Sequence, residues 1–143
     1  MGKYIGNIVT DGGPTGYSCQ FNGSSQYLTL PSDAAFSFGT GDFTIEFWLN
    51  YNANNCNLVD LRPGSTGIQP VIYLNSSNHI VYSVNGSNVI TGTQTLTTGT
   101  WYHVAIVSSG FANSGKFFVN GLQQGSAFTV NSTIANTTSI IAI

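Results

Sequence analysis

The segment that decides the fold reads Phe-Thr-Ile-Glu-Phe-Trp-Leu and covers residues 43–49. Its apolar positions 43, 45, 47 and 49 alternate with positions 44, 46 and 48. This period of two predicts a β-strand with one buried face. The turn-forming residues Gly-Thr-Gly-Asp at 39–42 precede it, and an Asn-rich stretch at 50–57 predicts a loop after it.

Similar short apolar segments recur along the chain, and turn residues separate them. Asn-Gly pairs at 22–23, 85–86 and 120–121 are strong hairpin signals. Further strands are predicted at 17–21, 27–30, 58–61, 71–74, 79–84, 89–92, 101–107, 116–119, 128–130 and 140–143. Residues 101–107 are apolar on both faces, which is typical of a central strand. The only helical turn that we expect lies at 33–36. This pattern predicts an all-β sandwich or barrel.

The composition supports the same fold class and narrows the range of functions. Of 143 residues, 41% are hydrophobic, 13% are aromatic and only 6% are charged, and the net charge is −2. The three cations, Lys3, Arg62 and Lys116, are too few for a basic patch, which excludes phosphate-based binding of nucleic acid. We find neither a secretory signal at the start nor an apolar run that spans a bilayer, so we expect no membrane insertion.

Four motifs then occur in a fixed order. They read Phe-Asn-Gly-Ser-Ser-Gln-Tyr-Leu-Thr-Leu-Pro at 21–31, Phe-Thr-Ile-Glu-Phe-Trp at 43–48, Gly-Thr-Trp-Tyr-His-Val-Ala at 99–105 and Lys-Phe-Phe-Val-Asn-Gly at 116–121. The set resembles laminin-G-like domains of the concanavalin A-like lectin/glucanase superfamily. The resemblance implies an antiparallel two-sheet jelly-roll sandwich at 15–143, after an N-terminal segment or strand at 1–14. The neutral, Asn-rich variant resembles modules of tailed-bacteriophage virion proteins.

The C-terminal end departs from the family pattern. Family members usually add one or two strands with a pattern like Gly-x-Ile-Asp-Glu-x-Arg, whereas this chain ends in Ile-Ile-Ala-Ile at 140–143. A missing strand would expose a sheet edge or a part of the core. We expect residues 1–14, a strand of a neighbouring subunit, or the rest of a longer protein to cover it.

The acidic residues do not predict catalysis. Retaining glucanases of the superfamily need two carboxylates about 5–5.5 Å apart. The closest match is Asp42 with Glu46, but Asp42 lies in the predicted turn and no acid lies two residues from Glu46. No Gly-x-Ser-x-Gly motif supports a nucleophilic serine. We therefore expect no enzyme. We expect Glu46, between Ile45 and Phe47, to be partly buried and to pair with Arg62 or with backbone groups.

Calcium is common in the superfamily, and it needs six to eight oxygen ligands, usually with two or more carboxylates. Asp33 and Asp42 lie near predicted turns and are the candidate ligands; we expect no other cofactor. Cys19 and Cys56 fit neither a zinc site nor a redox motif, and we favour two separate buried thiols over a disulfide.

A carbohydrate site would combine exposed aromatic rings with amide donors from loops. The loops at 50–57 and 108–115 are the first places to look. The candidate ligand-binding residues are Tyr51, Asn54, Asn55, Tyr73 and Tyr82. His79 and His103 lack metal-ligand spacing, and we expect both to be hydrogen-bonded structural residues.

These observations favour a non-catalytic module of a phage virion, either a capsid decoration or a tail appendage. We expect it to form a homo-oligomer or to contact other virion proteins, and to adhere to cell-surface glycans. The alternative is a free-standing, extracellular carbohydrate-binding lectin, and a more remote one is a glucanase-like hydrolase. The low charge and the expected incomplete edge favour assembly over free lectin activity.

Overall fold

The computed structural model describes residues 7–9, 18–23, 25–30, 38, 41–62, 70–110, 112–130 and 141–142. Within these ranges, the regular structure consists only of β-strands. They are β1 Asn7–Val9, β2 Ser18–Gln20, β3 Thr29–Leu30, β4 Phe43–Leu49, β5 Cys56–Asp60, β6 Pro70–Leu74, β7 Ile80–Val84, β8 Ser87–Thr91, β9 Tyr102–Ser108, β10 Lys116–Val119, β11 Leu122–Gln123 and β12 Ile141–Ala142. None of the described segments is a helix long and apolar enough to cross a membrane.

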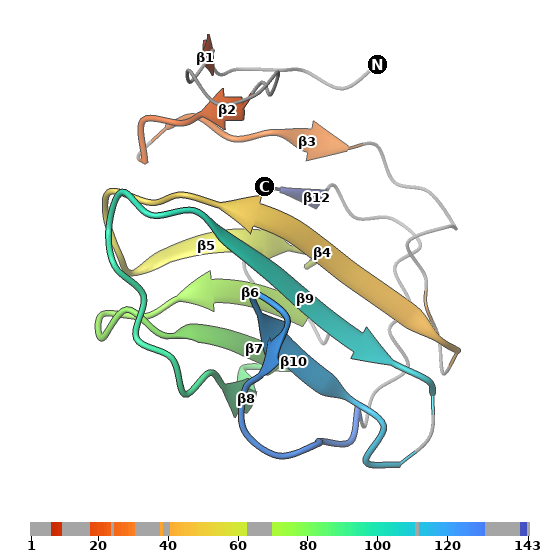
Figure 1. Ribbon diagram of the computed structural model, residues 1–143. Helices are drawn as coiled ribbons and strands as arrows, with labels where there is room; N and C mark the ends of the chain where they lie inside the picture. The colour runs from red at the N-terminus through yellow and green to blue at the C-terminus, as the bar shows by residue number, and fades with distance from the viewer. Residues whose placement is uncertain are drawn as a thin grey trace.

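The strands form two large antiparallel sheets and one small ribbon. One sheet has six strands in the order β3-β12-β5-β6-β7-β8, and the other has four in the order β11-β10-β9-β4. In Figure 1, β9 and β10 pass in front of β6 and β7, so the two sheets lie as two layers. β1 and β2 pair separately. The prediction of an antiparallel two-sheet sandwich is confirmed.

Local sequence signals explain most of these strands. β4 shows the predicted alternation of burial, and its outward-facing Trp48 is 65% exposed. β9 lies between β4 and β10, as its apolar character on both faces predicted. Asn85-Gly86 joins β7 to β8 and Asn120-Gly121 joins β10 to β11, all four residues with positive φ. This backbone geometry suits two-residue hairpins and explains why Asn-Gly occurs there.

One predicted strand differs from the observed structure. The segment 128–130 makes only an isolated bridge, between Phe128 and Gly115. The strand predicted at 140–143 is present as β12, which pairs with β3 on one side and with β5 on the other. Figure 1 shows β12 between these two strands. The chain thus places its own C-terminal strand in the six-stranded sheet, whereas the pairing described for β1 is with β2. The helical turn expected at 33–36 lies outside the described residues.

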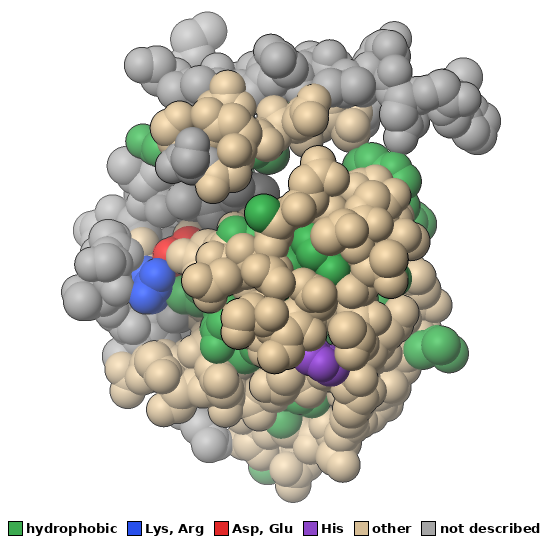
Figure 2. Space-filling model, turned by 90° about the vertical axis from the view of Figure 1, so that its left-hand side faces the viewer, with side chains coloured by type: hydrophobic (Ala, Val, Ile, Leu, Met, Phe, Trp, Pro, Cys, Tyr) green, Lys and Arg blue, Asp and Glu red, His purple; other side chains and the backbone are tan. Residues whose placement is uncertain are grey.

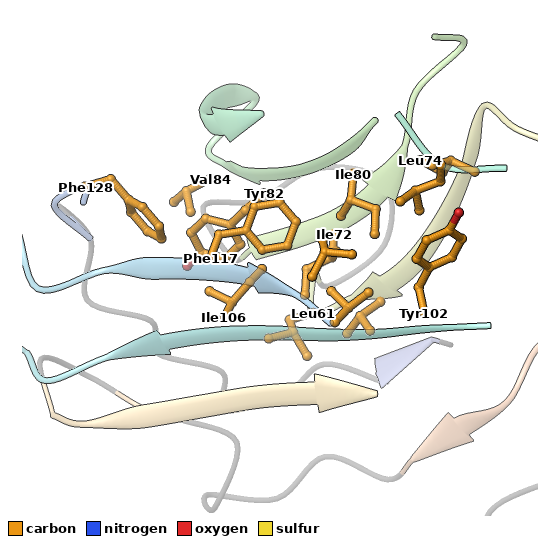
Figure 3. Packing of buried hydrophobic residues seen from close by; sticks show 14 of the residues in the cluster. Leu61, Ile72, Leu74, Ile80, Tyr82, Val84, Tyr102, Ile106, Phe117 and Phe128 are labelled. Atoms are coloured by element: carbon orange, nitrogen blue, oxygen red, sulfur yellow. The ribbon is translucent and has the colours of Figure 1, made fainter. Parts of the chain in front are cut away.

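The core lies between the two large sheets. Figure 3 shows Ile72 and Tyr82 of the six-stranded sheet facing Ile106 and Phe117 of the four-stranded sheet. All four side chains are at most 1% exposed. Burying each large apolar side chain stabilises the fold by about 1.5–3 kcal/mol. This shared layer fixes the positions of the side chains that point outward from each sheet.

Candidate functional site

The side chains that point away from the core form two outer faces. We call the first the six-strand face; the pairing of β5 to β8 places on it Asn57, Asp60, Val71, Tyr73, Val81, Ser83 and Asn88. We call the second the four-strand face; the pairing of β4, β9 and β10 places on it Thr44, Glu46, Trp48, His103, Ala105, Val107, Lys116 and Phe118.

The six-strand face contains a hollow of about 190 Å³, which we call the β6 hollow. It is lined by Asn57, Arg62, Val71, Tyr73, Ser83 and Gly86. Asn57 lies opposite Tyr73 across β5 and β6, and Val71 lies opposite Ser83 across β6 and β7. Pockets for drug-sized molecules occupy about 300–1,000 Å³. The β6 hollow is smaller, and its size suits a single ring or the end of a longer ligand.

An irregularity in β5 brings the polar residues of the hollow together. The register shifts between Asn57 and Val59, so one extra residue is inserted into β5. In a regular strand, residues three positions apart point to opposite faces. The bulge restores Asp60 to the side of Asn57, and the Asn57 amide donates to Asp60 Oδ2 at 3.2 Å.

Asp60 also pairs with Arg62, just beyond the end of β5. The guanidinium donates from Nε to Oδ1 at 2.9 Å and from Nη2 to Oδ2 at 2.7 Å, and the Arg62 main-chain N–H donates to Oδ1 at 3.0 Å. The two side chains are 24% and 15% exposed for Arg62 and Asp60. Hydrogen bonding to Asp60 raises the pKa of Arg62 and outweighs the lowering by burial. This is a fixed, bidentate ion pair with no net charge.

The expected pair between Glu46 and Arg62 is therefore wrong. Glu46 lies on the four-strand face, and Arg62 follows a strand of the other sheet. The Glu46 side chain is 62% exposed, and its Oε2 lies 3.5 Å from His103 Nε2. The alternation of β4 turns Glu46 to solvent, where a carboxylate is hydrated and needs no cation.

Two of the candidate ligand-binding tyrosines are buried, contrary to prediction. Tyr51 is 5% exposed and its hydroxyl donates to the main-chain oxygen of Leu96 at 2.8 Å. Tyr82 is 0% exposed and packs against Phe128, with ring centroids 5.7 Å apart. Tyr82 shares the inward side of β7 with Ile80 and Val84, so its ring belongs to the core. Neither ring is open to a surface ligand.

The other three candidates are on the surface, but the structure does not bring them together. Tyr73 lines the β6 hollow and donates its hydroxyl to Asn88 Oδ1 at 3.0 Å. Asn54 lies in the loop after β4, and its amide donates to Ser76 O at 3.0 Å and to Asn78 Oδ1 at 2.8 Å. Asn55 follows with a φ of 57°.

Figure 2 shows that neutral polar and backbone atoms dominate one side of the molecule, with acidic and basic groups adjacent at one point.

The candidate calcium ligands do not form a site within the described part of the chain. Asp33 lies outside the described residues. Asp42 is exposed and lines a second hollow together with Lys116, a cation. No three His, Cys, Asp or Glu residues cluster among the described residues. Calcium prefers several carboxylates, so the described residues around Asp42 do not fit it.

The remaining candidates from the sequence are one histidine and the two cysteines, and none of them lies in a ligand site described above. The two ring nitrogens of His79 lie 2.8 Å from Gly92 O and 3.2 Å from Thr95 Oγ1. Cys19 and Cys56 are free thiols. Cys19 is exposed, contrary to the prediction, while Cys56 is half-buried, and burial raises the pKa of its thiol.

The comparison with known families agrees with this architecture. A laminin-G sequence model described as "Concanavalin A-like lectin/glucanases superfamily" matches residues 22–143. No curated protein matches the chain. The matched region includes β3 to β12 and therefore every strand of both large sheets. The chain belongs to the laminin-G-like group of the concanavalin A-like lectin/glucanase superfamily, whose fold is of a carbohydrate-binding type.

Proposed function

We propose that the chain is a non-catalytic module of a phage virion and that it adheres to neutral surface glycans through the β6 hollow. The observation that carries the proposal is the arrangement of this hollow. Tyr73, Asn57 and Ser83 line it, and the Ser83 hydroxyl donates to Ser87 O at 3.0 Å. Because Asp60 compensates the charge of Arg62, the hollow presents donors, acceptors and an aromatic ring without net charge. A sugar offers matching hydroxyl groups and an apolar ring face.

The arrangement of the carboxylates supports a role without catalysis. Glu46 has Thr44 and Trp48 beside it on the same face of β4, and Ala105 opposite it. Asp42 precedes Glu46 by four residues, which corresponds to about 13 Å in an extended chain. Glycosidases of the retaining type need a separation of about 5–5.5 Å. Hydrolysis of a β-glucan that is lost in Glu46→Gln would contradict this part of the proposal.

The virion role is supported by the surface chemistry and by the resemblance to phage modules. Only 6% of the residues are charged, so the module has little electrostatic self-repulsion to oppose close packing of copies. A small hollow binds one glycan end weakly. Several copies on one particle raise the overall affinity about 10²- to 10⁴-fold without new contacts. Homo-oligomers or arrays on a capsid or tail would supply these copies.

A glycan array with matched variants tests the adhesion. We expect the chain to bind neutral glycans and Tyr73→Ala to reduce the array signal at least about tenfold, the loss of a good aromatic contact. Asn54→Ala, which changes an exposed loop amide away from the β6 hollow, should retain the signal. A flat array for the unchanged chain, or full binding by a folded Tyr73→Ala, would show that the hollow is not the glycan site.

Particle sedimentation tests the virion role separately. We expect the chain to co-migrate with phage particles in a density gradient and to self-associate in sedimentation velocity. A stable monomer that binds glycans but stays at the top of the gradient would instead identify a free-standing lectin.

A further inference from the structure

The four-stranded sheet ends on one side in a long, regular strand. β4 has seven residues and pairs with β9 along its whole length without a register shift. Figure 1 shows it on the far side of β9 from β10. The other edge strands of the two large sheets are poorer templates for pairing. β3 and β11 have two residues each, and the register of β8 shifts against β7. Because short strands and bulges protect a sheet edge, β4 is the least protected of the four edges.

The hydrogen bonds of β9 show which main-chain groups of β4 point away from the sheet. The N–H and the C=O of His103 both bond to Asn120, on the side of β10. In an antiparallel ladder, residues that lie opposite each other alternate between hydrogen-bonded and non-hydrogen-bonded pairs. Trp48 lies opposite His103, so this pair is of the second kind. The main-chain groups of Thr44, Glu46 and Trp48 therefore point to the free edge, and within the described ranges no hydrogen bond reaches them.

Apolar side chains flank this edge on both sides of the strand. On the inward side, Ile45, Phe47 and Leu49 pack against the core but are only partly buried. Their neighbour Ile106 in β9 is 0% exposed. On the outward side, Trp48 is 65% exposed. A further strand beside β4 would bury more of these side chains, and the burial of apolar surface is favourable.

A second copy of β4 fits this edge. Two identical strands pair antiparallel about a two-fold axis, which uses the same surface of both chains. An axis at Glu46 would place two carboxylates directly opposite each other, which is destabilising. With the axis at Phe47, Glu46 lies opposite Trp48 of the second copy, and these two residues exchange main-chain hydrogen bonds. On the inward side, the two Phe47 rings then lie opposite each other and Ile45 lies opposite Leu49. This register matches apolar with apolar side chains and keeps like charges apart.

We propose that two copies of the chain join through their β4 strands, antiparallel and with Phe47 opposite Phe47. The two four-stranded sheets then become one continuous sheet. The inference rests on the self-association in the proposed function and names the strand that carries it, but it requires neither a particle nor a glycan. The four-strand face, with its partly exposed Val107 and Phe118, remains open in this dimer.

Sedimentation velocity of the full chain over a range of concentrations tests the interface, with reductant present so that the exposed Cys19 cannot link two copies. We expect a concentration-dependent dimer. Glu46→Pro should raise its Kd at least about tenfold, because proline has no N–H to donate across the edge. Proline is tolerated on edge strands, so the near-UV circular dichroism should remain native.

Two variants are matched controls for the proline substitution. Glu46→Ala removes the same side chain but keeps the main-chain N–H, and it should still form the dimer. Phe118→Ser removes an apolar ring from the four-strand face but leaves the β4 edge unchanged, and it should also form the dimer. Loss of the dimer in Phe118→Ser, with the dimer retained in Glu46→Pro, would mean that the copies meet through this face, which overturns the inference.

Hydrogen exchange of the unchanged chain gives a second measurement that needs no variant. The amide protons of Glu46 and Trp48 should be protected when the dimer is populated and should exchange rapidly after dilution. Those of Ile45 and Phe47 bond to β9, so they should be protected in both states. A dimer without this alternation overturns the inference alone. A chain that stays monomeric overturns both the inference and the proposed self-association, whereas the glycan array decides separately on adhesion.

Discussion

The two outer faces of the sandwich hold their carboxylates in opposite ways. On the six-strand face, Asp60 accepts hydrogen bonds from Asn57 and from three donors of Arg62, and it is 15% exposed. On the four-strand face, Glu46 is 62% exposed and has a 3.5 Å contact with His103. The Asp60 carboxylate is held by hydrogen bonds within the protein, next to the β6 hollow. The second is largely exposed to solvent, so we expect it to contribute little to stability.

The largest expected effect tests the committed carboxylate. Asp60→Ala should lower the free energy of unfolding by about 2 kcal/mol, because it leaves a partly buried guanidinium without its carboxylate. Urea denaturation measures the change. Asp42→Ala removes an exposed carboxylate and should change the value by less than about 0.5 kcal/mol. Equal effects of the two variants would mean that the Asp60–Arg62 pair does not stabilise the fold.

The contrast between the two faces explains how far the sequence could predict them. Alternation in 43–49 correctly placed Trp48 and Glu46 on the side opposite the apolar residues, but the expected partial burial of Glu46 was wrong, because its side chain is 62% exposed. In β7 both sides are buried, so the period of two could not show that Tyr82 faces the core. The sequence also could not reveal the bulge in β5, which alone places Asp60 on the side of Asn57. The Asp60–Arg62 pair was missed for that reason, although the two residues lie only two positions apart.

The hydroxyl of Tyr82 allows a similar comparison between a polar group with a hydrogen-bond partner and one without. Among the described residues, Tyr82 has the one buried side-chain oxygen or nitrogen that makes no hydrogen bond. Tyr82→Phe should therefore raise the free energy of unfolding by about 1 kcal/mol at neutral pH. Tyr51→Phe is the matched control with the opposite sign, because it loses the bond to Leu96 O. Destabilisation by both variants would show that Tyr82 has a bonding partner, such as water.

The pH dependence of stability gives an independent test of Tyr82. Burial raises the pKa of its hydroxyl. Above the ordinary tyrosine pKa of about 10, the unfolded chain releases this proton while the folded chain keeps it. The raised pKa therefore contributes stability that is complete below pH about 10 and is lost as the pH rises further. In Tyr82→Phe the decline between pH about 10 and 12 should be shallower. An unchanged slope would contradict a buried, neutral hydroxyl.

The smallest expected effect concerns the open carboxylate. Double-mutant cycles compare the coupling of Glu46 to His103 with that of Asp60 to Arg62 on one scale. For Glu46→Gln with His103→Gln we expect a coupling of less than about 0.5 kcal/mol at neutral pH, since both groups are solvated and 3.5 Å apart. For Asp60→Asn with Arg62→Gln the coupling should exceed about 1 kcal/mol, because the pair is bidentate and mostly buried. If the first coupling equals the second, Glu46 is committed to His103. The two faces would then not differ in the way that the contacts indicate.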